Sequence, residues 1–398
     1  MRQVLSWARC PGGGLTATVE SYRFHPVTTM QRQAQAVFVA WRDLRFAKGR
    51  FALMGTVIVL ITLLVGLLSG LTAGLGRQNI SAITDLPADK IAFGTPGSGE
   101  ELSYSNSTVT EKQWQQWAEA PGVSSAEPLG ITTTKATAGN RSTGVSAFGV
   151  EPGSALAPDS TRFSDRATVL STAAADDLGV TAGDTFTLAG QEVTVAAVSG
   201  DVSFSHTPVV WTSLDAWQQV APPTGKNDGP VATVIALNTS SGTDVKATDE
   251  AADTKTVSKD DSLSAIGSYT SENGSLQLMR GFLFAISALV IGAFFTVWTI
   301  QRSGDVAVLK ALGASTGNLL KDALGQAVIL LTGGTLIGTG IAAGLGVLVA
   351  GSAVPFLLTP ATVLVAAVVM IALGALGAAL SIRRITSVDP LTALGSAR

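Results

Sequence analysis

The sequence predicts a membrane protein with four transmembrane α-helices and a large α+β domain inserted between the first and second of them. Residues 51–76, 281–300 and 323–382 contain no charged side chain. Between the first two of these stretches lies a long polar segment with short alternating runs, which are typical of strands. A helix of about 20 apolar residues is enough to cross the hydrocarbon core of a bilayer.

Four transmembrane helices are predicted, at 51–76, 280–301, 324–350 and 361–382. The first two uncharged stretches have the length of one helix each, since a helix rises about 1.5 Å per residue. The third stretch is long enough for two helices. We place the turn between them in the segment AVPFLLTP, because Pro355 and Pro360 cannot both lie inside one straight helix.

The distribution of charge orients these helices. Residues 77–280 hold 24 of the 29 acidic side chains but only 12 of the 26 basic ones, so the rest of the chain has 5 acidic and 14 basic side chains. Short basic flanks mark the cytoplasmic ends of spans. The flanking bases are Arg42, Arg45, Lys48, Arg50, Arg302, Lys310, Arg383 and Arg384. We therefore expect a multi-pass protein of the cell membrane with both termini and residues 302–323 in the cytoplasm and residues 77–279 outside.

The two ends of the chain are expected to be tails. Residues 1–36 lack the apolar core and cleavage site of a signal peptide and are predicted to be disordered, and Met30 is an alternative translation start. Residues 383–398 are predicted to be a cytoplasmic tail. The single cysteine, Cys10, cannot form an internal disulfide, so the α+β domain must be stabilised by its own hydrophobic core.

The α+β assignment of residues 77–279 rests on short runs separated by Gly, Asn and Pro. Strands are expected at DKIAFG, RATVLS, DTFTLAGQEVTVAAVSG, HTPVVWTS and VATVIALN, and helices at TVTEKQWQQWAEA, STAAADDLG and TSLDAWQQVA. The domain has one histidine, His206, and no G-x-S-x-G or H-E-x-x-H pattern, so a catalytic or zinc site is not expected. Trp114 and Trp117 are expected to pack in the core, with a ligand platform as the alternative.

The sequence also limits the source of energy. It contains no G-x-x-x-x-G-K-[ST] motif, so it is not a P-loop ATPase and we do not expect an enzyme. The predicted spans carry no ionisable side chain, although ion-coupled carriers usually need such groups within the membrane. We expect neither an intrinsic cofactor nor a metal site. If the protein is driven by ATP, a separate subunit must hydrolyse it.

The first predicted span carries three glycines at four-residue spacing, Gly66, Gly70 and Gly74. Small residues let helices approach closely in lipid, where no hydrophobic force drives helices together. The pattern favours a helix-packing face, either within the subunit or across a dimer. A generic abundance of glycine in these spans is the alternative.

The long insert after the first span, the phrase QRSGDVAVLKALGAS and the closing segment RRITSVDPLTALG resemble the MacB/FtsX-type permeases of ABC transporters. The resemblance covers residues 37–395. Within that family, the segments SYTSENGSLQLMRGFLFAISALVIGAFFTVWTIQR and GLTAGLGRQNISAITDLPADKIAFG are most similar to the haem-exporting permeases of Gram-positive bacteria, the HrtB type.

The resemblance implies a homodimer of permeases with two cytoplasmic ATPase subunits, working by mechanotransmission from the ATPases to the outer domain. Residues 304–313 would be the coupling helix within the cytoplasmic segment 302–323, with contacts to the ATPase at Asp305, Leu309, Lys310 and Gly313. Residues 37–50 would form a cytoplasmic amphipathic helix along the membrane, with a plain basic anchor as the alternative. The expected partners are the ATPase, a second copy and membrane lipid, with no nucleic acid.

The candidate substrate site is one face of a helix that leads into the second span. Tyr269, Glu272, Leu276 and Met279 share that face. Tyrosine and methionine are known axial ligands of haem iron, and a carboxylate is a second oxygen ligand for ferric iron. Haem, the cargo that the resemblance implies, is the expected transported ligand, and His206 is a separate candidate ligand. The alternative is a solvated acid, an interfacial tyrosine and a lipid-facing methionine.

Three functions remain open at this stage. The first is an ATP-driven exporter of haem from the outer leaflet. The second is a related exporter of a lipid, lipoprotein or antibiotic peptide. The third is an FtsX-like signal transducer that moves no cargo.

Overall fold

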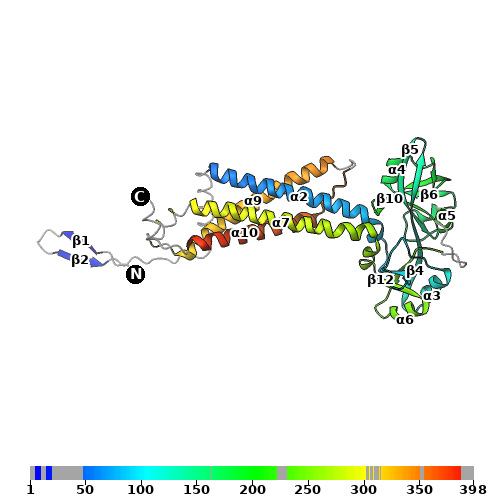
Figure 1. Ribbon diagram of the computed structural model, residues 1–398. Coiled ribbons are helices and arrows are strands. Elements are labelled where there is room, and N and C mark those ends of the chain that lie inside the picture. The colour runs from blue at the N-terminus through cyan, green and yellow to red at the C-terminus, as the bar shows by residue number, and fades with distance from the viewer. Residues whose placement is uncertain are drawn as a thin grey trace. The chain divides into compact units, whose positions relative to one another are not determined.

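The computed structural model describes residues 5–9, 15–19, 48–162, 164–221, 231–301, 315–349 and 354–386, with the single positions 304, 308 and 313. Within these residues, four helices are long and apolar enough to cross a membrane. They are α2 (Lys48–Thr84), α7 (Gly267–Gln301), α9 (Thr316–Val349) and α10 (Pro360–Thr386) (Figure 1). The chain divides into two compact units, one of residues 1–61, 287–337 and 369–398, and the other of residues 62–286 and 338–368.

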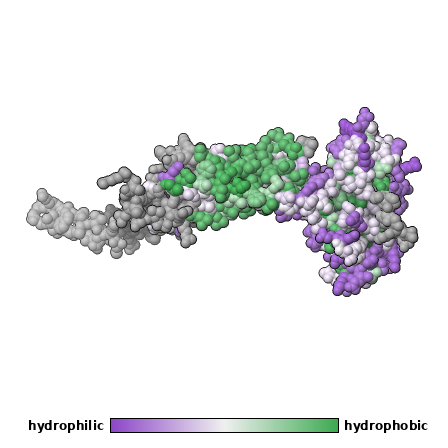
Figure 2. Space-filling model, in the orientation of Figure 1, coloured by the Kyte–Doolittle hydropathy of each residue, from purple (hydrophilic) through white to green (hydrophobic). Residues whose placement is uncertain are grey.

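The predicted fold class is confirmed: an α+β domain lies in the chain between the first two of the four apolar helices. Hydrophobic residues cover the visible surface of the helices, whereas the surface of the α+β domain is largely hydrophilic (Figure 2). The helices are longer than the predicted spans. The helix of the second span, α7, begins at Gly267 and so includes the helix that was predicted to lead into the span, and α2 continues to Thr84. Both extensions are polar but contain no proline, so nothing in them ends the helix.

Ten residues of the predicted N-terminal tail form a pair of strands. Strands β1 (Leu5–Arg9) and β2 (Leu15–Val19) pair antiparallel, with Leu5 opposite Val19. The sequence between them, CPGGG, consists largely of residues that favour turns. The strands themselves alternate polar and apolar residues, which suits an extended pair.

Small residues bring helices together in the unit of residues 1–61, 287–337 and 369–398. A Cβ atom added to Gly334 of α9 would meet Ile58 of α2, and one added to Gly374 of α10 would meet Leu331 of α9. Gly377 of α10 lies against Gly292 of α7. The four helices therefore contact one another through glycine, as close packing in lipid requires.

The α+β domain is built on one continuous sheet. Its strand order is β12-β3-β11-β4-β5-β10-β6-β8-β7, with β9 paired to β10 and β4 also paired to β7. The strands are β3 (Lys90–Gly94), β4 (Val123–Ala138), β5 (Arg141–Val150), β6 (Ala167–Leu170), β7 (Thr185–Leu188), β8 (Gln191–Val198), β9 (Ser203–Phe204), β10 (Thr207–Ser213), β11 (Val234–Thr239) and β12 (Thr254–Ser258). The domain's helices are α3 (Glu111–Ala118), α4 (Thr172–Leu178), α5 (Leu214–Val220) and α6 (Val245–Ala252), with short 3-10 turns at Ser160–Arg162 and Asp261–Ala265.

The long strand β4 joins two parts of this sheet. Its residues 123–129 pair with β11, whereas residues 130–138 pair with β5. Because residues 136–137 also pair with β7, the strands from β4 through β5, β10, β6 and β8 to β7 form a closed ring. The five predicted strand segments are all present. The β4–β5 hairpin was not predicted.

The two tryptophans of α3 pack in one of the domain's hydrophobic cores. Trp117 of α3 is completely buried, and its Nε1 donates to Thr254 Oγ1 over 2.9 Å. Trp114 donates from Nε1 to the carbonyl of Ala126 over 2.8 Å. This confirms the interpretation of the tryptophan pair as core packing rather than as a ligand platform.

Candidate functional site

A two-residue turn between β9 and β10 places a histidine beside the long helices. Ser205 and His206 have φ angles of 50° and 63°, the left-handed pair that a type I′ hairpin turn requires. Neither residue is glycine, and each such conformation costs roughly 1–3 kcal/mol. The turn is held in place by α2, because the N–H of Ser205 donates to the carbonyl of Asn79 over 2.9 Å and that of His206 to the carbonyl of Gln78 over 3.1 Å.

Five polar side chains meet at this turn. His206 Nε2 lies 2.8 Å from Glu272 Oε2 of α7. Asn79 Nδ2 of α2 lies 3.2 Å from His206 Nε2 and 3.5 Å from Glu272 Oε2, and Asn79 Oδ1 accepts from the hydroxyl of Ser268 over 2.7 Å. The hydroxyls of Ser268 and Ser205 are 2.8 Å apart. The cluster thus joins α2, α7 and the β9–β10 turn.

The hydrogen-bond pattern assigns the proton of this histidine. Asn79 Oδ1 accepts from Ser268, so the amide nitrogen of Asn79 faces His206 and Glu272. One ring nitrogen cannot both donate to a carboxylate and accept from an amide. The shorter contact, to Glu272, therefore places the hydrogen on Nε2. As a result, the two groups that could bind a metal centre, Nε2 of His206 and Oε2 of Glu272, are bonded to each other.

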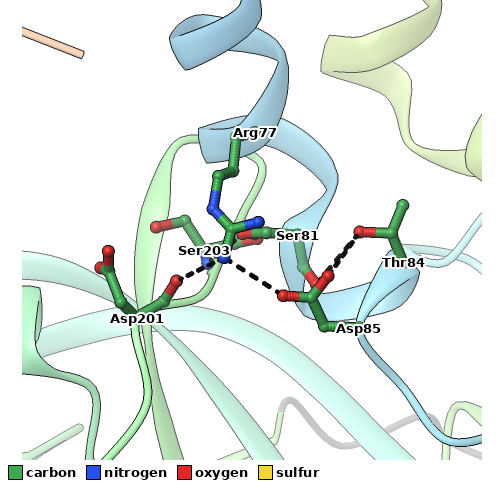
Figure 3. Close-up of polar contacts among 6 residues, drawn as sticks. All are labelled: Arg77, Ser81, Thr84, Asp85, Asp201 and Ser203. Atoms are coloured by element: carbon green, nitrogen blue, oxygen red, sulfur yellow. Dashed lines mark hydrogen bonds and ion pairs between the residues drawn. The ribbon is translucent and has the colours of Figure 1, made fainter. Parts of the chain in front are cut away.

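A second group of contacts fastens the same segment to the end of α2 (Figure 3). Ser81 accepts from the N–H of Ser203 over 2.8 Å and donates to its carbonyl over 3.3 Å. Arg77 donates to the carboxylate of Asp85 over 3.3 Å and to the carbonyl of Asp201 over 3.5 Å. Residues 201–206 are thereby attached to successive turns of α2.

Three of the four predicted substrate residues line one small cavity between α2 and α7. Tyr269, Glu272 and Leu276 border a space of about 90 Å³, while Met279 does not border it and is 48 % exposed. The other lining residues are Thr72, Gly76, Asn79, Asn273, Gln277 and Arg280. Pockets that enclose a ligand usually measure about 300–1,000 Å³. This cavity therefore cannot enclose a macrocycle, and the face is a wall rather than a pocket.

The predicted packing glycines of α2 face other parts of the same chain. A Cβ atom on Gly66 would lie 2.9 Å from that of Ala342 in α9. One on Gly70 would meet the ring of Phe356, and one on Gly74 the carbonyl oxygen of Pro355. Gly70 also accepts a hydrogen bond from the N–H of Leu357 over 3.0 Å. The glycine face of α2 therefore packs against α9 and against residues 355–357, which precede α10.

Most of the predicted coupling segment lies outside the described residues, including Asp305, Leu309 and Lys310. Gly304 is helical, and Gly313 lies in a turn with a φ of 90°. Such an angle favours glycine and is common directly after a helix.

Sequence reasoning missed three parts of this site. It treated His206 and Glu272 as separate candidates, and it did not single out Asn79 or Arg280. A signal existed for Asn79 and Arg280, since both are polar residues at the ends of apolar spans. No sequence signal could pair His206 with Glu272, because the two residues are 66 positions apart and meet only through the tertiary fold.

Other candidate sites in the described residues are weaker. No group of three or more His, Cys, Asp and Glu side chains there could hold a metal ion. A larger, polar cavity of about 460 Å³ lies in the α+β domain beside α3, at residues 93–113 and 251–253, and contains none of the predicted site residues.

The clear pKa shifts also lie away from the cluster. Burial raises the pKa of Tyr104. Burial and then the nearby charge of Asp215 raise the pKa of Glu151, whereas hydrogen bonds from the backbone and hydroxyl of Thr181 lower that of Asp184.

Comparison with known families gives two matches along the chain. Residues 51–255 match the family described as MacB-like periplasmic core domain. Residues 278–390 match the family described as FtsX-like permease C-terminal. The first match alone spans more than half of the chain.

Relatives of similar length are found in several bacteria. A proposed hemin transport system permease protein HrtB of Staphylococcus haemolyticus is 25 % identical over 364 residues, and one of Staphylococcus epidermidis is 25 % identical over 373 residues. An uncharacterised ABC transporter permease of Mycobacterium tuberculosis is 25 % identical over 374 residues. Each alignment covers 90 % of this chain and 99 % of the relative.

Two solved structures resemble part of the chain. The extracellular domain of the ABC-type transporter YknZ from Gram-positive bacteria is 15 % identical with a TM-score of 0.31, covering 43 % of this chain and 99 % of that domain. The periplasmic region of MacB from Actinobacillus actinomycetemcomitans is 12 % identical with a TM-score of 0.32, covering 46 % of this chain and 94 % of that region.

Proposed function

Because this chain belongs to the MacB/FtsX family of ABC transporter permeases, we propose that it is the membrane subunit of an ATP-driven exporter that removes haem from the outer leaflet. In this proposal the α+β domain lies outside the cell and both termini lie in the cytoplasm. A cytoplasmic ATPase subunit hydrolyses ATP, and a second copy of the chain completes the permease.

The observation that carries the haem proposal is the cluster at the outer ends of α2 and α7. It brings a carboxylate, an imidazole and a phenol, on Glu272, His206 and Tyr269, next to an exposed apolar surface. Leu278, Met279 and Phe282 contribute to that surface. An amphiphilic macrocycle with a metal centre needs both kinds of surface. The names of the staphylococcal relatives support the same cargo.

The contact between His206 and Glu272 adds a condition to this proposal. His206 Nε2 can ligate iron only after it leaves Glu272 Oε2, because the two atoms are 2.8 Å apart and the nitrogen donates to the oxygen. Ligation by His206 would therefore loosen the β9–β10 turn from α7. The turn also offers a route for mechanotransmission. A movement of α2 would pull on it through the backbone carbonyls of Gln78 and Asn79, and a movement of α7 would pull on it through Glu272 and Ser268.

The small volume of the cavity supports a site shared by two subunits. The cavity of one subunit has a volume of about 90 Å³, which is too small to surround a porphyrin. A facing copy of α7 would supply the opposite wall. Haem would enter sideways from the bilayer, along the apolar surface of α7.

The test is a haemin titration of the purified protein in lipid nanodiscs, following the Soret band. Wild type should give a saturable shift. Glu272→Ala should weaken binding about tenfold, because the iron ligand is lost. This factor corresponds to a loss of about 1.4 kcal/mol of binding free energy. His206→Ala should strengthen binding a few-fold, because Glu272 then loses a competing hydrogen bond worth about 1 kcal/mol. Lys246→Ala, on an 88 % exposed side chain of the α+β domain, is the control.

Opposite results would revise the proposal in different ways. If His206→Ala weakens binding and Glu272→Ala strengthens it, haem remains the cargo and His206 is the ligand. If wild type shows no saturable shift, haem is not the cargo. A lipid, lipoprotein or peptide cargo, or signalling without cargo, would then be tested next.

A further inference from the structure

Arg280 is a cation at the edge of the apolar part of α7 that has no partner among the residues the structure describes. It is the last charged residue before the uncharged stretch 281–300. It is half-buried and lines the same cavity as Tyr269 and Glu272. Among the described residues, no hydrogen bond or ion pair involves Arg280, whereas Arg77 at the end of α2 donates to Asp85 and Asp201. The guanidinium group of Arg280 is therefore available to a ligand.

The size of the cavity limits what this arginine can bind there. A space of about 90 Å³ admits a short arm of a ligand, such as a carboxyethyl group, but not a macrocycle. Its lining also includes the amide side chains of Asn273 and Gln277. Amides and a guanidinium are all hydrogen-bond donors, and arginine binds planar carboxylates with two parallel bonds. The chemistry at this end of the cavity suits a carboxylate.

The acid in the same cavity does not oppose this binding. Glu272 precedes Arg280 by eight residues, which corresponds to about 12 Å along the helix axis. Its Oε2 atom contacts His206 and Asn79, at the other end of the cavity. The cavity thus has an acid engaged with the β9–β10 turn at one end, and at the other a base that no described residue pairs with.

We propose that Arg280 binds a carboxylate of the cargo and makes the permease selective for porphyrins with free carboxylates. The proposal rests on the proposed haem-export function. Haem carries two propionate carboxylates on one edge of an apolar ring, so one cationic residue at the membrane boundary can hold that edge. A phosphate of a lipid headgroup has the same anionic chemistry and is the competing occupant.

The test compares haemin with haemin dimethyl ester, which keeps the iron and the ring but lacks both charges. Titrations use the full-length protein in nanodiscs of phosphatidylcholine. Wild type should bind haemin about tenfold more tightly than the ester, the ratio expected for one charge-assisted pair. Arg280→Gln should bind both at the affinity of the ester, and Arg280→Lys should keep part of the preference. Lys246→Gln removes a surface charge elsewhere and should behave as wild type.

The outcomes separate this inference from the function on which it rests. If wild type binds both compounds equally, or if Arg280→Gln keeps the preference, Arg280 is not the carboxylate-binding residue although haem binding stands. If wild type binds neither compound, the haem-export function and this inference both fail. Repeating the titration with phosphatidylglycerol in the nanodiscs tests the lipid as occupant. A preference that persists there supports the cargo carboxylate, and one that disappears assigns Arg280 to the headgroup.

Discussion

At the scale of single residues, the candidate site depends on a strained turn. Ser205 and His206 hold left-handed conformations that glycine would adopt more easily, yet glycine would supply neither the hydroxyl bonded to Ser268 nor the imidazole bonded to Glu272. The two backbone hydrogen bonds to α2 compensate part of this strain. The side-chain contacts at the turn thus come with an unfavourable backbone conformation, a combination that is common at functional sites.

Tyr104 gives a pH-dependent prediction at the same scale. Its hydroxyl donates to Ser262 Oγ over 2.9 Å, and its ring packs against Phe93 and Phe204 in the domain core. Burial raises its pKa well above the usual value of about 10. The folded state therefore holds the proton more tightly than the unfolded state. The stability linked to this proton is complete below about pH 10 and is lost as the pH rises further.

We expect Tyr104→Phe to shift alkaline unfolding to higher pH, at a cost of about 1 kcal/mol of unfolding free energy at neutral pH for the lost hydrogen bond. Tyrosinate absorbance at 295 nm and near-UV circular dichroism, followed together from pH 8 to 13, measure this. In wild type, the last tyrosinate signal should rise with unfolding, and the variant should lack that component. A Tyr104 that ionises near pH 10 without unfolding would contradict the prediction.

At the scale of elements, the glycine face of α2 gives a matched pair of variants. A Cβ on Gly74 would collide with the carbonyl of Pro355, whereas one on Gly76 would meet no atom within 4 Å. Gly74→Ala should therefore lower the unfolding free energy by about 1–3 kcal/mol through overpacking against the loop before α10. Gly76→Ala should be neutral or raise it by about 0.5–1 kcal/mol, since alanine favours the helix.

Thermal unfolding in detergent, followed by tryptophan fluorescence, compares the two variants directly. The expected order of unfolding temperatures is Gly76→Ala at or above wild type, then Gly74→Ala several degrees below it. Equal destabilisation by both would mean that flexibility of α2, and not the contact with residues 354–359, is the reason for these glycines.

The elements themselves were predictable to the extent that local signals define them. The apolar spans and the strands from β6 to β8 follow from hydropathy and alternation. The β4–β5 hairpin was missed because its run of Thr, Ser, Gly and Ala, from Gly130 to Gly149, carries no strong apolar alternation. The part of α7 before residue 280 was also predictable, because Tyr269, Glu272, Leu276 and Met279 recur at helical spacing ahead of the second span. A polar helix can continue beyond the lipid where a domain contacts it.

At the scale of the whole molecule, the candidate site depends on contacts between distant parts of the chain, which the sequence alone does not predict. Tyr269, Glu272 and Leu276 were predictable as one face because helical periodicity alone brings them together. Their partners come from residues 72–79 and 205–206, which lie beside α7 through the folded sheet and the contact of the β9–β10 turn with α2. Pairings over such distances depend on topology. Arg280 belongs to the predicted face by position, but its lack of a partner could be recognised only from the structure.

The single cysteine allows a test of the orientation on which the export proposal depends. The excess of bases outside residues 77–280 predicts that Cys10 lies in the cytoplasm and the α+β domain outside. In intact cells, a membrane-impermeant maleimide should leave the wild-type protein unlabelled and should label it after permeabilisation. A Cys10→Ser, Lys246→Cys variant should be labelled in intact cells, because Lys246 is 88 % exposed on the α+β domain. Labelling of Cys10 from outside with protection of position 246 would invert the topology. In that case the face formed by Tyr269, Glu272 and Arg280 would lie at the inner leaflet, where it could not take cargo from the outer one.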